Sequence, residues 1–125
     1  MANPQKAKGD RYENEIAKYF NEHVYGRDQC SRAPLSGGGR VGLGSGGSDL
    51  LGTPGLFIEA KRVERLSFRD AVAQAERNAA LTRAPEHPIV VTRRNREATG
   101  DSLIVMRLQS FEKFYRAWLA AEGHI

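Results

Sequence analysis

A tight turn between two apolar segments is the feature that most restricts how this chain folds. Thr53-Pro54-Gly55 combines the fixed φ of proline with the conformational freedom of glycine, which a sharp reversal requires. Apolar residues precede the turn at 48–52 and follow it at 56–61, so we predict a β-hairpin. The second arm alternates in character, and period-two geometry places Glu59 and Lys61 on the same face of the strand.

Periodicity along the rest of the chain predicts three helices and further strands. Apolar residues at helical spacing predict a helix over 6–20, and Ser67 is a suitable N-cap for a second helix over 68–83. Residues 25–33 favour a strand, and 88–92 with 102–106 predict a second hairpin.

The C-terminal segment from Ser110 carries aromatic residues three and four positions apart. This spacing predicts an amphipathic helix whose aromatic stripe packs into the core. The predicted order is therefore α-β-β-β-α-β-β-α, an α/β fold with a central mixed β-sheet flanked by helices.

Length and composition favour one globular domain over residues 1–125. The chain has 125 residues, of which 40% are hydrophobic and 27% charged, which is an ordinary balance for a folded protein. Cys30 is the only cysteine, so no disulfide can form within the chain. The first eight residues lack an apolar signal region, so we expect a soluble, cytoplasmic protein with no membrane partner. The net charge of +4 and the pI near 9.5 favour polyanionic partners.

Residues 36–48 are rich in glycine and predict a flexible loop. Residues 42–47 match the spacing G-x-G-x-x-G, but a dinucleotide site needs a helix directly after that motif, whereas a strand and turn are expected here. We therefore expect no nucleotide cofactor. Arg40 suggests instead a loop that embraces DNA, or an ordinary surface loop.

The predicted hairpin also brings together residues suited to metal chemistry. Adjacent strands can place Asp49 beside Glu59, and two carboxylates form a hard oxygen site suited to Mg²⁺. Lys61 would orient or deprotonate an attacking water, or offset charge on a phosphate. Glu13 lies on the apolar side of the first predicted helix, where a third acid near a metal would explain it. A plain surface hairpin with an ion pair is the alternative.

Several motifs in this order resemble archaeal-type Holliday junction resolvases of the PD-(D/E)XK nuclease superfamily. They are Lys8-Gly9-Asp10-Arg11-Tyr12-Glu13, Arg32-Ala33-Pro34-Leu35-Ser36-Gly37, Asp49, and Glu59-Ala60-Lys61, and they span the first two thirds of the chain. The resemblance implies a restriction-endonuclease-like core with Glu13, Asp49, Glu59 and Lys61 in the site. One departure is that Ser48, rather than proline, precedes Asp49.

The same resemblance implies further site residues. Ser36 matches a loop serine implicated in catalysis, Gln74 resembles a glutamine on the helix after the E-x-K strand, and the carbonyl of Ala60 is a metal ligand alongside the acids. The implied activity is Mg²⁺-dependent cleavage of DNA four-way junctions, with Mn²⁺ able to substitute, by a homodimer.

Basic residues near these motifs are candidate phosphate contacts. The candidates are Lys8, Arg11, Arg32, Arg40, Arg62 and Arg65. Two alternatives remain open: a related nuclease acting on duplex, flap or mismatched DNA, and a DNA-binding module without catalysis. Metal dependence separates the enzymes from the binding module.

Overall fold

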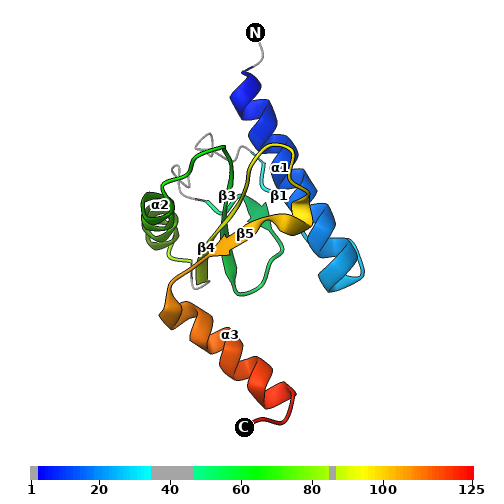
Figure 1. The fold of residues 1–125 in the computed structure, drawn as a ribbon, viewed down its shortest axis with the longest axis vertical. Coiled ribbons are helices and arrows are strands. Elements are labelled where there is room, and N and C mark those ends of the chain that lie inside the picture. Colours follow the sequence, from blue (N-terminus) through cyan, green and yellow to red (C-terminus); the bar gives the residue numbers. More distant parts are fainter. Residues whose placement is uncertain (1–2, 35–46, 85–86) are drawn as a thin grey trace.

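A computed structural model of the chain describes residues 3–34, 47–84 and 87–125 (Figure 1). The fold is α/β. Its order is α1 (Pro4–Phe20), the π-helical turn η1 (Asn21–Tyr25), β1 (Ser31–Arg32), β2 (Leu50–Leu51), β3 (Leu56–Arg62), α2 (Phe68–Leu81), β4 (His87–Arg93), the short 3₁₀ turn η2 (Thr99–Asp101), β5 (Leu103–Val105) and α3 (Leu108–Ala121).

The strands form a mixed arrangement. β3 pairs in parallel with β4, and β5 pairs antiparallel with the other edge of β4. β1 and β2 form a short antiparallel pair. The backbone N–H of Asp49 donates to the carbonyl of Ile58 at 2.8 Å, which ties the β1–β2 pair to the free edge of β3.

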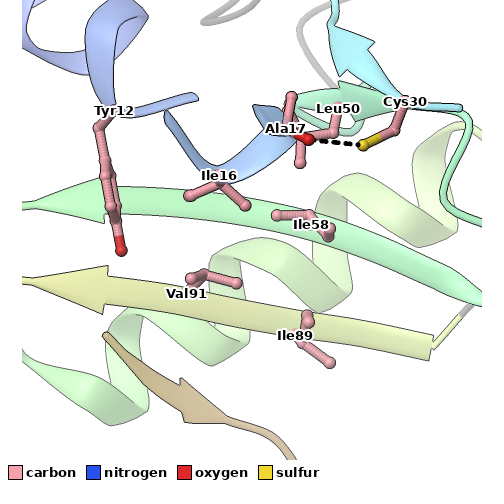
Figure 2. Packing of buried hydrophobic residues seen from close by; sticks show 8 residues of the cluster. All are labelled: Tyr12, Ile16, Ala17, Cys30, Leu50, Ile58, Ile89 and Val91. Atoms are coloured by element: carbon pink, nitrogen blue, oxygen red, sulfur yellow. Dashed lines mark hydrogen bonds between the residues drawn. The ribbon is translucent and has the colours of Figure 1, made fainter. Parts of the chain in front are cut away.

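Helices cover both faces of the sheet: α1 lies on one side and α2 on the other (Figure 1). On the α1 side, Tyr12 and Ile16 pack over Ile58 of β3 and Val91 of β4 (Figure 2). On the α2 side, Ala71, Val72 and Ala75 pack with Val90, the strand neighbour of Glu59. Because successive side chains alternate across a strand, Ile58 points toward α1 and Glu59 toward the α2 side.

A single side chain anchors the connection that follows α1. The Asn21 amide nitrogen donates to the carbonyl of Cys30, and its oxygen accepts from the backbone N–H groups of Gln29 and Cys30, each at 2.9 Å. Gly26 allows the reversal with φ of 68°. This connection reverses the direction of the chain, so that β1 lies beside the hairpin.

The predicted order of helices and strands is confirmed, and so is the second hairpin, since β4 pairs antiparallel with β5. The first hairpin forms only in part: the Asp49 N–H donates to the Ile58 carbonyl, but β2 forms its strand pair with β1 rather than with β3. The segment 25–33 contains only a two-residue strand, because its first part completes the π-helical turn and is held by Asn21. The second helix ends at Leu81, two residues before the expected end. In the described part of the chain, no helix has the length and apolar character needed to cross a membrane.

The prediction that the aromatic stripe of the C-terminal helix forms part of the core is wrong. α3 extends away from the sheet (Figure 1), and it contains no buried residue. The spacing correctly indicates an apolar helix face, but no other element of the described chain lies where it would cover that face.

Candidate functional site

Asp49 lies at the free edge of β3, where main-chain and side-chain hydrogen bonds hold it. Its carbonyl accepts from the N–H of Ala33 at 2.9 Å, and its Oδ2 accepts from the N–H of Ala60 at 2.8 Å. Only 6% of the residue is exposed. The carboxylate is thus fixed beside β3 by the hairpin that the Thr53-Pro54-Gly55 turn creates.

Ser48 fastens the two arms of this hairpin next to Asp49. Its Oγ accepts from the N–H of Ile58 at 3.0 Å and donates to the carbonyl of Ile58 at 3.4 Å. A proline at this position has no hydroxyl to make these bonds. The serine before Asp49 therefore has a clear structural role in placing the acid.

Glu59 and Lys61 share one face of β3, as the alternation predicts. Lys61 Nζ lies 3.5 Å from Glu59 Oε1, and Glu59 is 7% exposed. The hydroxyl of Thr92 donates to the carbonyl of Lys61 at 2.6 Å, which fixes this end of β3 against β4. The ammonium group consequently stands beside the acid rather than in bulk solvent.

Burial and mutual repulsion perturb the acids strongly. Burial is the main cause that raises the pKa of Asp49 to about 8, and the negative charges of Glu59 and Glu13 add to it. The Ala60 N–H and the Lys61 charge act in the opposite direction but do not compensate. Burial also raises the pKa of Glu59, against the lowering effect of Lys61. This site therefore favours added positive charge or retained protons.

Glu13 is buried on α1, as the sequence predicts, with 7% exposed. It acts on Asp49 electrostatically, from the α1 side of the sheet. Glu59 belongs to the other side, so Asp49 at the strand edge lies between the two. Across the described ranges, no group of three or more His, Cys, Asp or Glu side chains is placed to hold one metal ion. The three acids are neighbours of one site rather than one compact ligand set.

The carbonyl of Ala60 faces the same edge of β3 as Asp49. The N–H groups of Ile58 and Ala60 both point to the β2 edge, toward Ser48 and Asp49. Within a strand, the carbonyl of a residue points to the same edge as its N–H. The Ala60 carbonyl therefore lies on the Asp49 side of β3.

A pocket of about 340 Å³ adjoins Lys61 on the α2 side of β3. Lys61 and Gln74 both line it, so the structure brings these two predicted residues together. Arg65 and Arg77 line it as well, and neither forms a hydrogen bond or salt bridge with a described residue. Asp70 is the acidic residue in the lining. The pocket is thus positively charged overall and next to the acids.

Arg77 is the residue that sequence reasoning missed. It lies three positions after Gln74 on α2, and residues at that spacing share a helix face. The three-residue spacing between Gln74 and Arg77 on one helix could have indicated that Arg77 belongs to the same site.

The other predicted DNA contacts are dispersed. Lys8 and Arg11 lie on α1, where Arg11 is exposed, and Arg32 is 3.5 Å from Asp10. Arg62 follows Lys61 and so points to the opposite face of β3, where its Nε donates to Asn95 at 3.1 Å. The structure does not bring Arg62 into the pocket beside Lys61.

Two predicted residues, Ser36 and Arg40, lie outside the described residues, as does most of the glycine-rich loop. The segment after that loop continues into β2 rather than into a helix, as expected.

Comparison of the chain with protein-family models, with curated proteins and with solved structures finds no match.

Proposed function

We propose that this chain is a metal-dependent DNA endonuclease that hydrolyses phosphodiesters, with four-way junctions as its substrate. One observation carries the proposal: two buried acids with raised pKa, Asp49 and Glu59, stand beside Lys61 at the open edge of a strand. A structural ion pair would need only one acid for one lysine. Two buried acids for one lysine, with pKa values that a nearby cation would lower, are typical of a cation site.

The donor set fits a hard divalent ion. Asp49, Glu59 and the Ala60 carbonyl offer two carboxylates and a neutral oxygen, and Mg²⁺ commonly takes one or two carboxylates while keeping several waters. When bound, Mg²⁺ or Mn²⁺ would supply a water of lowered pKa and offset negative charge on the reacting phosphoryl group. Glu13 would act on Asp49 through its charge, consistent with its place on the other side of the sheet.

The protein groups around this centre have separate tasks. The Ala60 N–H and the Ser48 hydroxyl hold Asp49 and β3 in register, so that the acids need little reorganisation. Lys61 lies beside Glu59 and can donate a hydrogen bond to the attacking water or to a phosphate oxygen. Water then adds to phosphorus, the bond from phosphorus to the leaving sugar oxygen breaks, and that oxygen gains a proton.

The positively charged pocket suggests where the DNA backbone continues. Arg65 and Arg77 have no partner among the described residues, and they lie next to Lys61 and Gln74. Guanidinium groups bind phosphate in a bidentate manner, so a phosphate next to the scissile one fits this pocket. The mixed sheet with α1 and α2 on its two faces is compatible with the restriction-endonuclease-like core that the sequence resemblance implies.

The decisive test compares DNA of matched sequence as a four-way junction, a flap and a plain duplex, each with Mg²⁺, with Mn²⁺ and with a chelator. We expect metal-dependent cleavage of the junction in preference to the others. Equal cleavage of duplex and junction would overturn the junction specificity. No cleavage of any DNA with either metal would overturn the nuclease proposal.

Two variants sharpen this test. Asp49→Asn keeps an oxygen that can accept from the Ala60 N–H but removes the charge, so we expect loss of cleavage with junction binding retained. Glu112→Gln removes an exposed acid on α3, far from β3 in sequence, and serves as the matched control. Normal cleavage by Asp49→Asn would exclude Asp49 from the site.

A further inference from the structure

The C-terminal helix α3 has one strongly apolar face. Large apolar side chains recur at three and four residue spacing, and they stack along the helix: the ring centroids of Phe111 and Tyr115 are 5.9 Å apart, and those of Tyr115 and Trp118 are 6.3 Å apart. The face comprises Leu108, Phe111, Phe114, Tyr115, Trp118 and Leu119. Lys113 and Arg116 lie on the other side of the helix.

This face is uncovered because α3 is attached to the body at its first turns. Arg107 forms a bidentate pair with Glu76 of α2, with both nitrogen–oxygen distances 2.9 Å. The His87 ring meets the edge of Phe114 at 5.1 Å between centroids. Beyond this point the helix leaves the sheet (Figure 1), and Tyr115 and Trp118 remain 49% and 53% exposed.

The exposed area is large for an isolated protein. An aromatic side chain can bury roughly 150–250 Å², so four such residues that are about half exposed leave on the order of 400 Å² uncovered. With Leu108, which is 78% exposed, the patch approaches the upper range for the largest patch on a monomer, about 600 Å². Two such faces packed together would bury about 1,000–1,200 Å², the lower limit for a specific interface.

The chemistry of the helix points to a second copy of the same helix as the occupant. Its charged residues are one acid, Glu112, and two bases, Lys113 and Arg116, so α3 carries a single net positive charge and its exposed face is aromatic rather than basic. An aromatic stripe along a straight helix is complementary to itself when the two helices run antiparallel. A two-fold axis through the middle of the stripe then gives each copy the same contacts.

We propose that the aromatic face of α3 is the surface through which two copies of this chain associate, with the two α3 helices packed antiparallel about a two-fold axis. The surface argument stands by itself, whereas the use of the dimer to make paired incisions in a junction rests on the proposed function.

Trp118 is the only tryptophan of the chain and lies in this face, so it reports on the interface directly. We expect the mass of the full chain, measured by light scattering and sedimentation, to change from two copies to one on dilution. The Trp118 emission should shift to longer wavelength over the same concentration range. A monomeric mass at every concentration up to hundreds of micromolar would overturn the proposal, as would a dimer whose formation leaves the Trp118 emission unchanged.

Variants on the two sides of α3 provide the matched comparison. Tyr115→Asp should produce a monomer with unchanged circular dichroism, because this side chain is half exposed and outside the core. Lys113→Ala, on the polar side, should leave the dimer intact. A dimeric Tyr115→Asp protein would exclude this face. Should Tyr115→Asp fail to fold, Trp118→Ser judged by mass alone replaces it, and a dimer there has the same meaning.

The direction of packing is tested with spin labels at Gln109→Cys or Lys113→Cys in a Cys30→Ala background. In an antiparallel pair, the labels near the helix start lie farther apart than those near the middle, at about 1.5 Å of rise per residue in each helix. Equal distances would overturn the antiparallel arrangement. The outcome for dimerisation is separate from the outcome for nuclease activity. If the protein dimerises but cleaves no DNA, the interface proposal stands and the nuclease proposal fails. If the protein is a monomer that cleaves junctions, the reverse holds.

Discussion

The backbone N–H of Ala60 donates a 2.8 Å hydrogen bond to Oδ2 of Asp49, which joins the two arms of the hairpin at the acid pair. This bond stabilises the ionised carboxylate, yet the pKa of Asp49 is still raised to about 8. Burial and the charge of Glu59 therefore outweigh it. Without a bound cation, the folded protein therefore favours the protonated form of Asp49 over the ionised carboxylate at neutral pH.

The stability of the metal-free protein should fall as pH rises. The folded-state pKa of Asp49, about 8, lies above the value near 3.9 expected in the unfolded chain, so between these values the folded state binds more protons. The free energy of unfolding consequently decreases from about pH 4 to about pH 8 by an amount on the order of a few kcal/mol, and the raised pKa of Glu59 acts in the same direction. Melting temperatures measured in chelator across this range check the prediction. Asp49→Asn should flatten the profile, and an equally steep profile in that variant would contradict the assignment to Asp49.

Replacing Lys61 with methionine should slow cleavage without abolishing DNA binding. The substitution keeps the length of the side chain but removes the ammonium beside Glu59, whose pKa should rise further. We expect a loss of at least about 10²-fold in the single-turnover rate, the usual scale for a group that stabilises charge in the transition state. Lys113→Met on α3 is the control. A Lys61→Met protein with the rate of the unmodified chain would remove Lys61 from the reaction.

The double variant Arg65→Ala with Arg77→Ala should reduce the salt dependence of DNA binding. Each lost phosphate contact lowers the slope of log K against log salt by about 0.9, so we expect a decrease between about 1 and 2. Fluorescence anisotropy with a fixed junction and Ca²⁺ in place of Mg²⁺ measures binding without turnover. Arg116→Ala, on the polar side of α3, should leave the slope unchanged. An unaltered slope in the double variant would show that no phosphate occupies the pocket.

Gly52→Ala should destabilise the protein more than Gly55→Ala does. Both glycines have positive φ, 81° and 85°, so an added Cβ is strained at either position, typically by about 1–3 kcal/mol. At Gly52 the Cβ would also collide with the backbone carbonyl of Gln29, whereas at Gly55 it meets open space. Urea denaturation of both variants supplies the comparison. Equal losses would mean that the Gln29 backbone moves aside freely.

Local patterns were enough to predict most of the secondary structure. The turn at Thr53-Pro54-Gly55, the apolar spacing of α1 and the two compact strands β4 and β5 each depend on neighbours a few residues away. For the same reason the shared face of Glu59 and Lys61 was predictable, since alternation along a strand is a local property. The exact length of the strand in 25–33 could not be predicted from local patterns, because the side chain of Asn21 determines it through hydrogen bonds to Gln29 and Cys30.

The candidate site was predictable only in part. Asp49, Glu59 and Lys61 follow from one hairpin, and a buried Glu13 follows from helix periodicity. That Glu13 and Glu59 reach Asp49 from opposite sides of the sheet depends on how α1 and α2 pack, which no local spacing reveals. The position of Arg77 beside Lys61 was unpredictable for the same reason, because it depends on the packing of α2 against β3 and β4.

The sequence by itself determined the kinds of element, their order and the chemical character of their faces, because these depend on backbone preferences and side-chain periodicity within a short segment. The tertiary structure alone decided which of those faces are covered. It buries the acids of the hairpin at the edge of β3, where their pKa values rise, and it leaves the aromatic face of α3 exposed. Burial depends on contacts between distant segments, and it is burial that turns a charged residue into a candidate site and an apolar stripe into a candidate interface.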